Sequence, residues 1–173
     1  MMLFRYCFPS EKYNFNNQTF DNCEELFNKK TKIVTIARVV DIYDGDTCTV
    51  IFKFRKIYTK FKIRLNGIDT PEMTSKDENQ KKKAILAKNR LLTLITKNDS
   101  HFFENKSKKE IRDLLNSKVY LINLTIYKTD KYGRLLGDLY NYPIKNNDIS
   151  FSQILINENL GYRYDGGTKD ITI

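Results

Sequence analysis

Apolar and polar residues alternate most regularly along residues 57–65. The odd-numbered positions there carry apolar or β-branched side chains, whereas the even-numbered positions carry Tyr58, Lys60, Lys62 and Arg64. A period of two is typical of a β-strand with one buried face. The pattern therefore predicts a strand that turns its odd-numbered face to a core and points Arg64 away from it, together with two lysines.

Four further segments have the composition of strands. Residues 33–40 and 47–54 are rich in β-branched residues, and Asp44-Gly45 between them is a hairpin signal. Arg55-Lys56 marks the turn into the alternating strand at 57–65. Residues 119–127 and 135–140 complete the set, with Tyr132-Gly133 in the turn between them.

Helices are expected in three places. After Pro71, Ser75-x-x-Glu78 resembles a capping box and predicts a helix from about residue 77 to 95. Ser107-x-x-Glu110 is a second capping box, which opens a short helix. Residues 151–158 form a third amphipathic segment, closed by Asn159 as a left-handed residue. Apolar stripes support the first two helices, formed by Ala84, Ala87, Leu91 and Ile95 and by Ile111, Leu114 and Leu115.

This order of elements predicts an α+β fold that is mainly β. Three strands, a helix, two strands and a terminal helix suit a small five-stranded barrel of the OB type with about three helices. We expect one domain over residues 31–173, with an insertion at about 97–117. Residues 1–30 are aromatic and rich in Asn, so we expect an N-terminal extension that packs on the domain, with a partner-docking arm as the alternative.

Composition narrows the class of protein. The 173 residues carry a net charge of +9, which favours contact with nucleic acid or an anionic membrane, unless the lysines only solvate the surface. Three cysteines without C-x-x-C spacing argue against a disulfide framework or a zinc site. The single histidine, His101, leaves little basis for a Ser-His-Asp triad. Without a long apolar run or a signal-peptide pattern, we expect an intracellular protein, in a compartment left open, that does not enter membranes.

Three short stretches carry the candidate chemistry, through Asp46, Arg64, Asp69, Glu72 and Arg134. If the fold brings them together, three carboxylates face two guanidinium groups. Three carboxylates resist ionising side by side, and a divalent cation would relieve that repulsion. Two arginines beside the cation would suit a phosphate. That set is what the hydrolysis of a phosphodiester requires.

The motifs around these residues resemble the staphylococcal nuclease (thermonuclease) family over residues 32–164. The order of the four pieces along matching elements makes the likeness specific. They are Asp44-Gly45-Asp46-Thr47, Ile63-Arg64-Leu65, Ile68-Asp69-Thr70-Pro71-Glu72 and Thr129-Asp130-Lys131-Tyr132-Gly133-Arg134. The resemblance implies an OB-type barrel and calcium-dependent, largely sequence-indifferent cleavage of DNA and RNA.

The resemblance also implies a role for each matching residue. A metal site would take Asp46, Asp69 and the backbone carbonyl of Thr70, oxygen donors that suit calcium or magnesium. Glu72 would act as the base on water. The phosphate clamp would be Arg64 and Arg134. Lys131 and Tyr132 match positions near the nucleotide in the family. The family also has a tyrosine pair beside the base, for which Tyr162 and Tyr164 are the nearest candidates. Asp44 matches an outer acidic position near the metal.

Plainer interpretations remain open for the same residues. Asp46 could cap its own turn, Asp69 could form an Asx-turn, and Glu72 could merely help to start a helix. On that basis the chain would be a catalytically silent OB-fold module that binds nucleic acid or protein, or a basic adaptor that docks through residues 1–30. As an enzyme it is expected to act as a monomer on DNA or RNA, with no protein partner implied.

Overall fold

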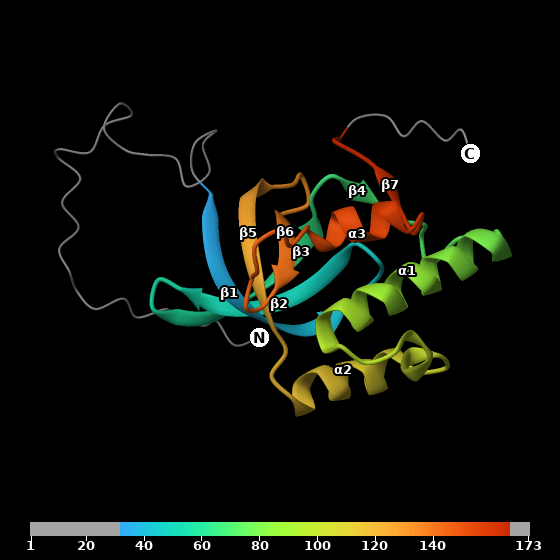
Figure 1. Cartoon of the computed structure of the whole chain (residues 1–173), viewed down its shortest axis with the longest axis horizontal. Coiled ribbons are helices and arrows are strands. Elements are labelled where there is room, and N and C mark those ends of the chain that lie inside the picture. Colours follow the sequence, from blue (N-terminus) through green and yellow to red (C-terminus); the bar gives the residue numbers. More distant parts are fainter. Residues whose placement is uncertain (1–31, 167–173) are drawn as a thin grey trace, which may run out of the picture.

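The computed structural model describes residues 32–166 of the chain, and its centre is a closed barrel of five strands (Figure 1). Around the barrel the strands follow the order β1-β2-β3-β6-β5. The predicted class, an α+β protein built on a five-stranded OB-type barrel with three helices, is confirmed. The strands are β1 (Ile33–Ile42), β2 (Thr47–Phe54), β3 (Ile57–Leu65), β5 (Leu121–Thr129) and β6 (Leu135–Asn141).

Pairing of the strands fixes which face is buried. β2 pairs with both β1 and β3 in antiparallel register, and β5 pairs in the same way with β1 and β6. β3 and β6 close the barrel in parallel over only three residues of β3, Ile63 to Leu65. As predicted, Ile63 and Leu65 face the core, whereas Lys60 and Lys62 are exposed. β5 begins two residues later than expected, because Val119 and Tyr120 belong to the connection from the preceding helix.

The long helix α1 (Glu78–Thr96) buries the predicted stripe but begins differently from the prediction. Asp77 is its N-cap, with a side chain that accepts hydrogen bonds from the backbone N–H groups of Asn79 (2.8 Å) and Gln80 (3.3 Å). The predicted capping by Ser75 is therefore wrong. Ser75 Oγ instead accepts from the backbone N–H of Asp77 at 3.2 Å, so it supports the N-cap residue from two positions earlier.

The insertion is a folded part of the barrel domain. It contains the 3-10 helix η1 (Ser100–Phe103) and the helix α2 (Lys108–Ser117), whose capping box between Ser107 and Glu110 is present as predicted. Arg112 of α2 forms an ion pair of 2.6 Å with Asp41 of β1. The amide of Asn116 donates to the carbonyl of Val40 at 3.1 Å. Because Ile111 and Leu115 join the same core as the barrel residues, the insertion contributes to that core.

The C-terminal part adds a second, very small sheet. β4 (Ile68–Asp69) pairs antiparallel with β7 (Tyr162–Arg163), and Asp69 lies opposite Tyr162. The sequence did not predict this sheet. Between β6 and β7, α3 (Phe151–Asn157) is followed by Asn159 in the predicted left-handed conformation, with φ of 58°. β7 is thereby brought back beside the end of β3.

Two further expectations concern the N-terminal extension and membrane-spanning helices. The N-terminal extension, expected over residues 1–30, lies outside the described residues, so its packing stays a prediction. Over residues 32–166, no helix combines the length and the apolar character needed to cross a membrane.

Packing of the insertion leads to a stability prediction. Leu115 is fully buried, so Leu115→Ala should lower the free energy of unfolding by about 2–5 kcal/mol through lost contacts and the cavity left behind. Leu86, which is 57% exposed on α1, is the matched control, and its Ala variant should change stability by no more than about 0.5 kcal/mol. Urea unfolding measures both. Equal, small effects would mean that the insertion is not part of the cooperative core.

Candidate active site

The turn between β1 and β2 places Asp46 against helix α1. The backbone N–H of Asp46 donates to Asp44 Oδ1 at 3.2 Å, so Asp44 caps the turn. A Cβ atom on Gly45 would lie 2.6 Å from Ala87 Cβ and 3.0 Å from Thr70 Cγ2. Gly45 is therefore required by the close approach of α1 and of the segment after β4, which together fix the position of the turn.

The Asp46 carboxylate joins two segments that are distant in the sequence. One oxygen, Oδ2, accepts hydrogen bonds from the backbone N–H of Thr70 at 2.9 Å and from Thr70 Oγ1 at 3.1 Å. The other, Oδ1, accepts from Thr47 Oγ1 at 3.0 Å. Asp46 is only 4% exposed. It therefore does not cap its own turn, which was the plain interpretation, but ties that turn to the end of β4.

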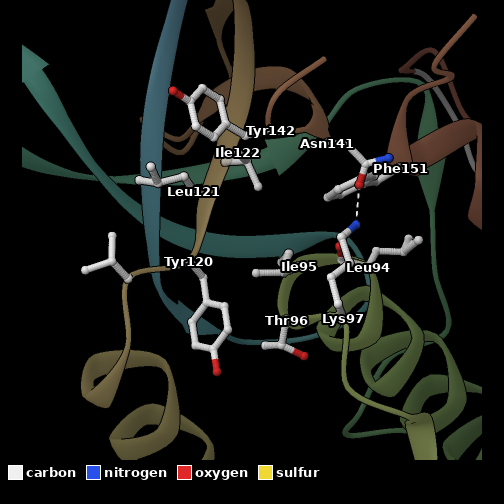
Figure 2. A pocket seen from close by; sticks show the side chains of 11 residues that line it. Leu94, Ile95, Thr96, Lys97, Tyr120, Leu121, Ile122, Asn141, Tyr142 and Phe151 are labelled. Atoms are coloured by element: carbon white, nitrogen blue, oxygen red, sulfur yellow. Dashed lines mark hydrogen bonds between the residues drawn. The ribbon is translucent and has the colours of Figure 1, made fainter. Parts of the chain in front are cut away.

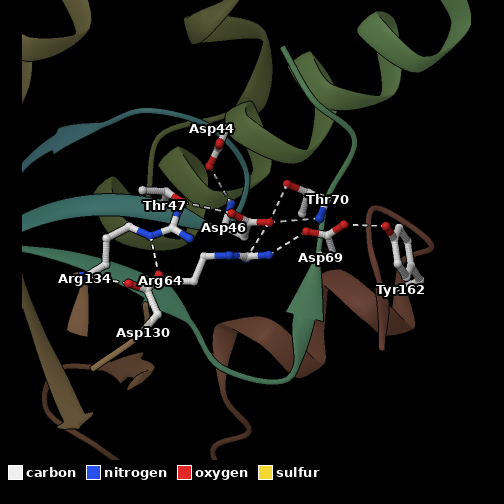
Figure 3. Close-up of polar contacts among 9 residues, drawn as sticks. All are labelled: Asp44, Asp46, Thr47, Arg64, Asp69, Thr70, Asp130, Arg134 and Tyr162. Carbon is white, nitrogen blue, oxygen red and sulfur yellow. Dashed lines mark hydrogen bonds and ion pairs between the residues drawn. The ribbon is translucent and has the colours of Figure 1, made fainter. Parts of the chain in front are cut away.

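Arg64 lies between two buried carboxylates (Figure 3). Its Nη1 is 2.6 Å from Asp46 Oδ2, and its Nη2 donates to Asp69 Oδ1 at 2.6 Å. The hydroxyl of Tyr162 donates to the other oxygen of Asp69. The Nη1 contact lacks the alignment of a hydrogen bond, so Arg64 Nη1 is buried with charge complementarity but without a hydrogen-bond acceptor.

Arg134 approaches the same turn from the β5–β6 connection, directly before β6. Asp130 braces it, because Asp130 Oδ2 accepts from Arg134 Nε at 2.6 Å and Oδ1 accepts from the Arg134 backbone N–H at 2.9 Å. The guanidinium also lies 5.6 Å from the ring centre of Tyr132. Its Nη1 is 3.5 Å from Thr47 Oγ1, the hydroxyl that donates to Asp46. Two bonds to one carboxylate set the direction of the Arg134 side chain.

These side chains line one cleft of about 1090 Å³. Thr70 and Tyr162 do not line the cleft directly. Thr70 is hydrogen-bonded to Asp46 and Tyr162 to Asp69, both of which line it. Glu72 is solvent-exposed at the cleft, and Tyr132 is 72% exposed. The predicted residues that line the cleft directly are Asp44, Asp46, Arg64, Asp69, Glu72, Lys131, Tyr132, Arg134 and Tyr164.

A second cavity of about 260 Å³ lies between the end of α1 and β5 (Figure 2). Lys97 lines this cavity, and its ammonium group donates hydrogen bonds to the side chain of Asn141 and, at 2.7 Å, to the carbonyl of Leu94. Its lining is largely apolar and contains no carboxylate, so it offers no acidic ligand for a cation.

The donors in the main cleft fit a hard divalent cation in kind. They are carboxylate oxygens, with no sulfur or imidazole beside them. Burial, and next the charge of Asp46, raise the pKa of Asp44 to about 7. Within residues 32–166, no three or more acidic, His or Cys side chains are already grouped around one ion position. An ion would therefore be held by few protein ligands.

Asp130 in the cleft and Thr47 beside it have roles that the sequence did not reveal. Asp130 appeared only as part of a motif, yet it holds Arg134 through two hydrogen bonds. Thr47 likewise links Arg134 to Asp46. The four-residue spacing from Asp130 to Arg134 was the available signal, since such a pair across a turn can form an ion pair. The contact of Thr47 spans 87 positions and had no local signal.

Comparison with known proteins identifies the family. The chain belongs to the staphylococcal nuclease family, because the family model described as staphylococcal nuclease homologue matches residues 62–169, well over half of the chain. The matched region contains Arg64, Asp69, Glu72 and Arg134, whereas the turn with Asp46 precedes it. No individual curated protein matches the chain. The family indicates a nuclease-like protein with nucleic acid as its substrate.

The contact between Gly45 and α1 can be tested by a double-mutant cycle. Gly45→Ala should lower the free energy of unfolding by about 1–3 kcal/mol through overpacking against Ala87. Ala87→Gly alone should cost about 1 kcal/mol of helix propensity. The double variant should lose less than the sum, since removing one methyl group makes room for the other. Ala84→Gly, one turn away on α1, is the control and should add to Gly45→Ala without coupling. Additivity at Ala87 would contradict the packing.

Asp130 gives a pH-dependent prediction. Burial, the largest single effect, would raise its pKa, but hydrogen bonds from the side chain and backbone of Arg134 and from the Tyr132 backbone, with the charge of Arg134, together outweigh burial and lower it. A lowered pKa in the folded state stabilises the protein above the unfolded value of about 3.9, and this stabilisation is lost as the pH falls through the folded value.

Asp130→Asn should therefore lower the free energy of unfolding by about 1–2 kcal/mol at neutral pH, and the difference from the parent should shrink in acid. Urea unfolding at neutral pH and well below the unfolded pKa measures this. Asp113→Asn, on the exposed side of α2, controls for the loss of one negative charge. If Asp130→Asn lowers the free energy of unfolding equally at both pH values, the charge of the Asp130 carboxylate is not what stabilises the turn.

Proposed function

We propose that the chain is a metal-dependent nuclease that hydrolyses phosphodiester bonds of DNA or RNA with little regard for sequence. The main support is the convergence of Asp46, Asp69 and Glu72 with Arg64 and Arg134 in one cleft. One contact at this cleft, between Thr47 and Arg134, joins positions 87 apart in the sequence. Membership of a nuclease family makes phosphodiester hydrolysis the natural chemistry for such a cleft.

In this proposal Asp46 and Asp69, with the backbone carbonyl of Thr70, hold calcium or magnesium. When bound, the ion supplies Lewis acidity and orients the scissile phosphate. Asp69 receives a hydrogen bond from Tyr162 and Asp46 receives three from Thr47 and Thr70. These bonds fix the direction of the two carboxylates, as a rigid ion site requires.

The two arginines bind the non-bridging oxygens of the phosphate. The Arg64 guanidinium already pairs with Asp46 and Asp69 at 2.6 Å, so it would share or exchange one of these contacts to bind a phosphate oxygen. Arg134 is held by Asp130 through Nε, which directs the rest of its guanidinium to the turn. Both groups gain strength as negative charge grows on the phosphate in the transition state, an effect worth roughly 3 kcal/mol per donor.

The remaining residues act on water and on the nucleotide. Glu72 lies exposed at the cleft, where it would take a proton from the attacking water. Tyr132 and Tyr164 line the cleft and offer rings to a base. Lys131 lies 5.1 Å from the Tyr132 ring centre and adds positive charge beside it. Tyr162 would affect the substrate indirectly, because its hydroxyl holds the Asp69 carboxylate through a hydrogen bond.

One observation favours a second candidate, a catalytically silent nucleic-acid-binding module. Arg64 already pairs with both Asp46 and Asp69 at 2.6 Å, so these contacts would hold the turn and β4 together even without a metal. The nuclease is preferred because a purely structural ion pair does not account for Glu72 and Arg134 at the same cleft. Cleavage assays separate the two candidates.

Purified protein should degrade single- and double-stranded DNA and RNA with calcium or magnesium, and not in excess chelator. Glu72→Gln and Arg134→Ala should each reduce the rate by about 100-fold or more, through loss of the base and of a phosphate donor. Glu158→Gln and Arg90→Ala are matched controls, because these residues form an ion pair away from the cleft, and both should keep the parental rate. Activity that persists in chelator would refute the metal, and binding without cleavage would favour the silent module.

A further inference from the structure

We propose that the outer face of the β2–β3 hairpin is a track for a single strand of nucleic acid that leaves the cleft. The proposal rests on the proposed function and extends it, because it assigns the residues that hold the substrate beyond the scissile phosphate. We call this face the basic ladder, and define it as Lys53, Tyr58, Lys60 and Lys62 together with the turn residues Arg55 and Lys56.

Strand register connects the ladder to the cleft. Arg64 of β3 lies opposite Thr47 of β2, and both contact Asp46. Two residues further from the cleft, Lys62 lies opposite Thr49; Lys60 then follows on the same face of β3. Since side chains on one face of a strand recur every roughly 7 Å, Arg64, Lys62 and Lys60 form an evenly spaced row that begins inside the cleft.

The charge of this hairpin is unbalanced. Residues 47–62 contain five Lys or Arg residues and no Asp or Glu. None of the ion pairs found within residues 32–166 involves any of these five cations. All five are exposed. The hairpin therefore presents a positively charged surface without acidic residues nearby in the sequence, and such a surface is complementary to a polyanion.

The hairpin is also shaped as an arm that extends beyond the barrel. β3 pairs with β6 only at its end, from Ile63 to Leu65, so its first six residues pair only with β2 among the described strands. Figure 1 shows the β2–β3 turn projecting at the side of the molecule away from α1. Phe52 and Phe61 stack with ring centres 4.5 Å apart, which stiffens the arm at its base.

The turn itself is unusual. Arg55 and Lys56 have φ values of 47° and 68°, the left-handed region that a two-residue hairpin turn requires and that Gly and Asn fill with least strain. Two long cations at these positions extend the charge of the ladder to its tip. Strained positions often mark surfaces under a functional constraint, and here the constraint is consistent with a polyanion that passes over the turn.

A nucleic-acid strand is the occupant that fits best. The row of cations starts at Arg64, which the proposed function assigns to the phosphate, so one backbone can contact the cleft and the ladder without a break. Tyr58 is 76% exposed among the cations, where its ring offers a surface for a base to stack on. An anionic membrane would match the charge but not this continuity with the cleft.

The test is the salt dependence of binding, measured in excess chelator so that nothing is cleaved. The triple variant Lys53→Gln, Lys60→Gln, Lys62→Gln is compared with the parent on a labelled oligothymidine longer than about 16 nucleotides, by fluorescence anisotropy. Loss of three phosphate contacts on a single strand should reduce the slope of log affinity against log salt by about 2. A matched triple variant, Lys82→Gln, Lys83→Gln, Lys109→Gln, removes the same charge from the exposed surfaces of α1 and α2 and should keep the parental slope.

Thermal unfolding of both triple variants checks that they are folded, which is expected because all six lysines are exposed. A parental slope in the ladder variant, or an equal loss in the control, would overturn the track. So would parental protein that binds vesicles of mixed phosphatidylcholine and phosphatidylserine but not the oligothymidine. If the parent binds with the expected slope difference and cleaves nothing with any divalent ion, the proposed function fails and the track stands.

Discussion

The contact on which the site depends is the Arg64 guanidinium held between Asp46 and Asp69. Each carboxylate lies 2.6 Å from it, and all three side chains are almost completely buried. Breaking such a buried pair leaves an uncompensated charge in a poorly solvated place, at a cost of about 3–5 kcal/mol. In the proposed function, the same burial would strengthen the attraction of the carboxylates for a cation and of the guanidinium for a phosphate.

The fold supports this contact from every side. α1 closes on the turn of Asp46 through Ala87 and Gly45, and β7 supports Asp69 through Tyr162. The β5–β6 turn adds Arg134, which Asp130 directs to Thr47. The barrel core stays apolar beneath, and β3 continues from Arg64 out to the basic ladder. A strand that alternates between core and surface can therefore stabilise the barrel with one face and bind a polyanion with the other.

Much of this could be predicted where the signal is local. The alternation from Ile57 to Leu65 placed β3 correctly to the residue, and the box at Ser107 opened α2 as expected. Two-residue strands such as β4 and β7 are too short to show a period, so their sheet was missed. The charged residues predicted for the site line one cleft, and their roles stay a prediction. Their pairing was not predictable, because the contacts of Arg64 with both carboxylates depend on how the β1–β2 turn, β3 and β4 come together in the folded chain.

Calorimetric titration of calcium, and separately of magnesium, into nucleic-acid-free protein tests the ion site most directly. The parent should bind one ion, and Asp69→Asn, confirmed as folded by circular dichroism, should bind none, because a neutral amide removes one of two anionic ligands. Glu158→Gln, away from the cleft, should bind like the parent. A parent that takes up neither ion, or an Asp69→Asn variant that binds as well as the parent, would contradict a cation site formed by the carboxylates that Arg64 bridges.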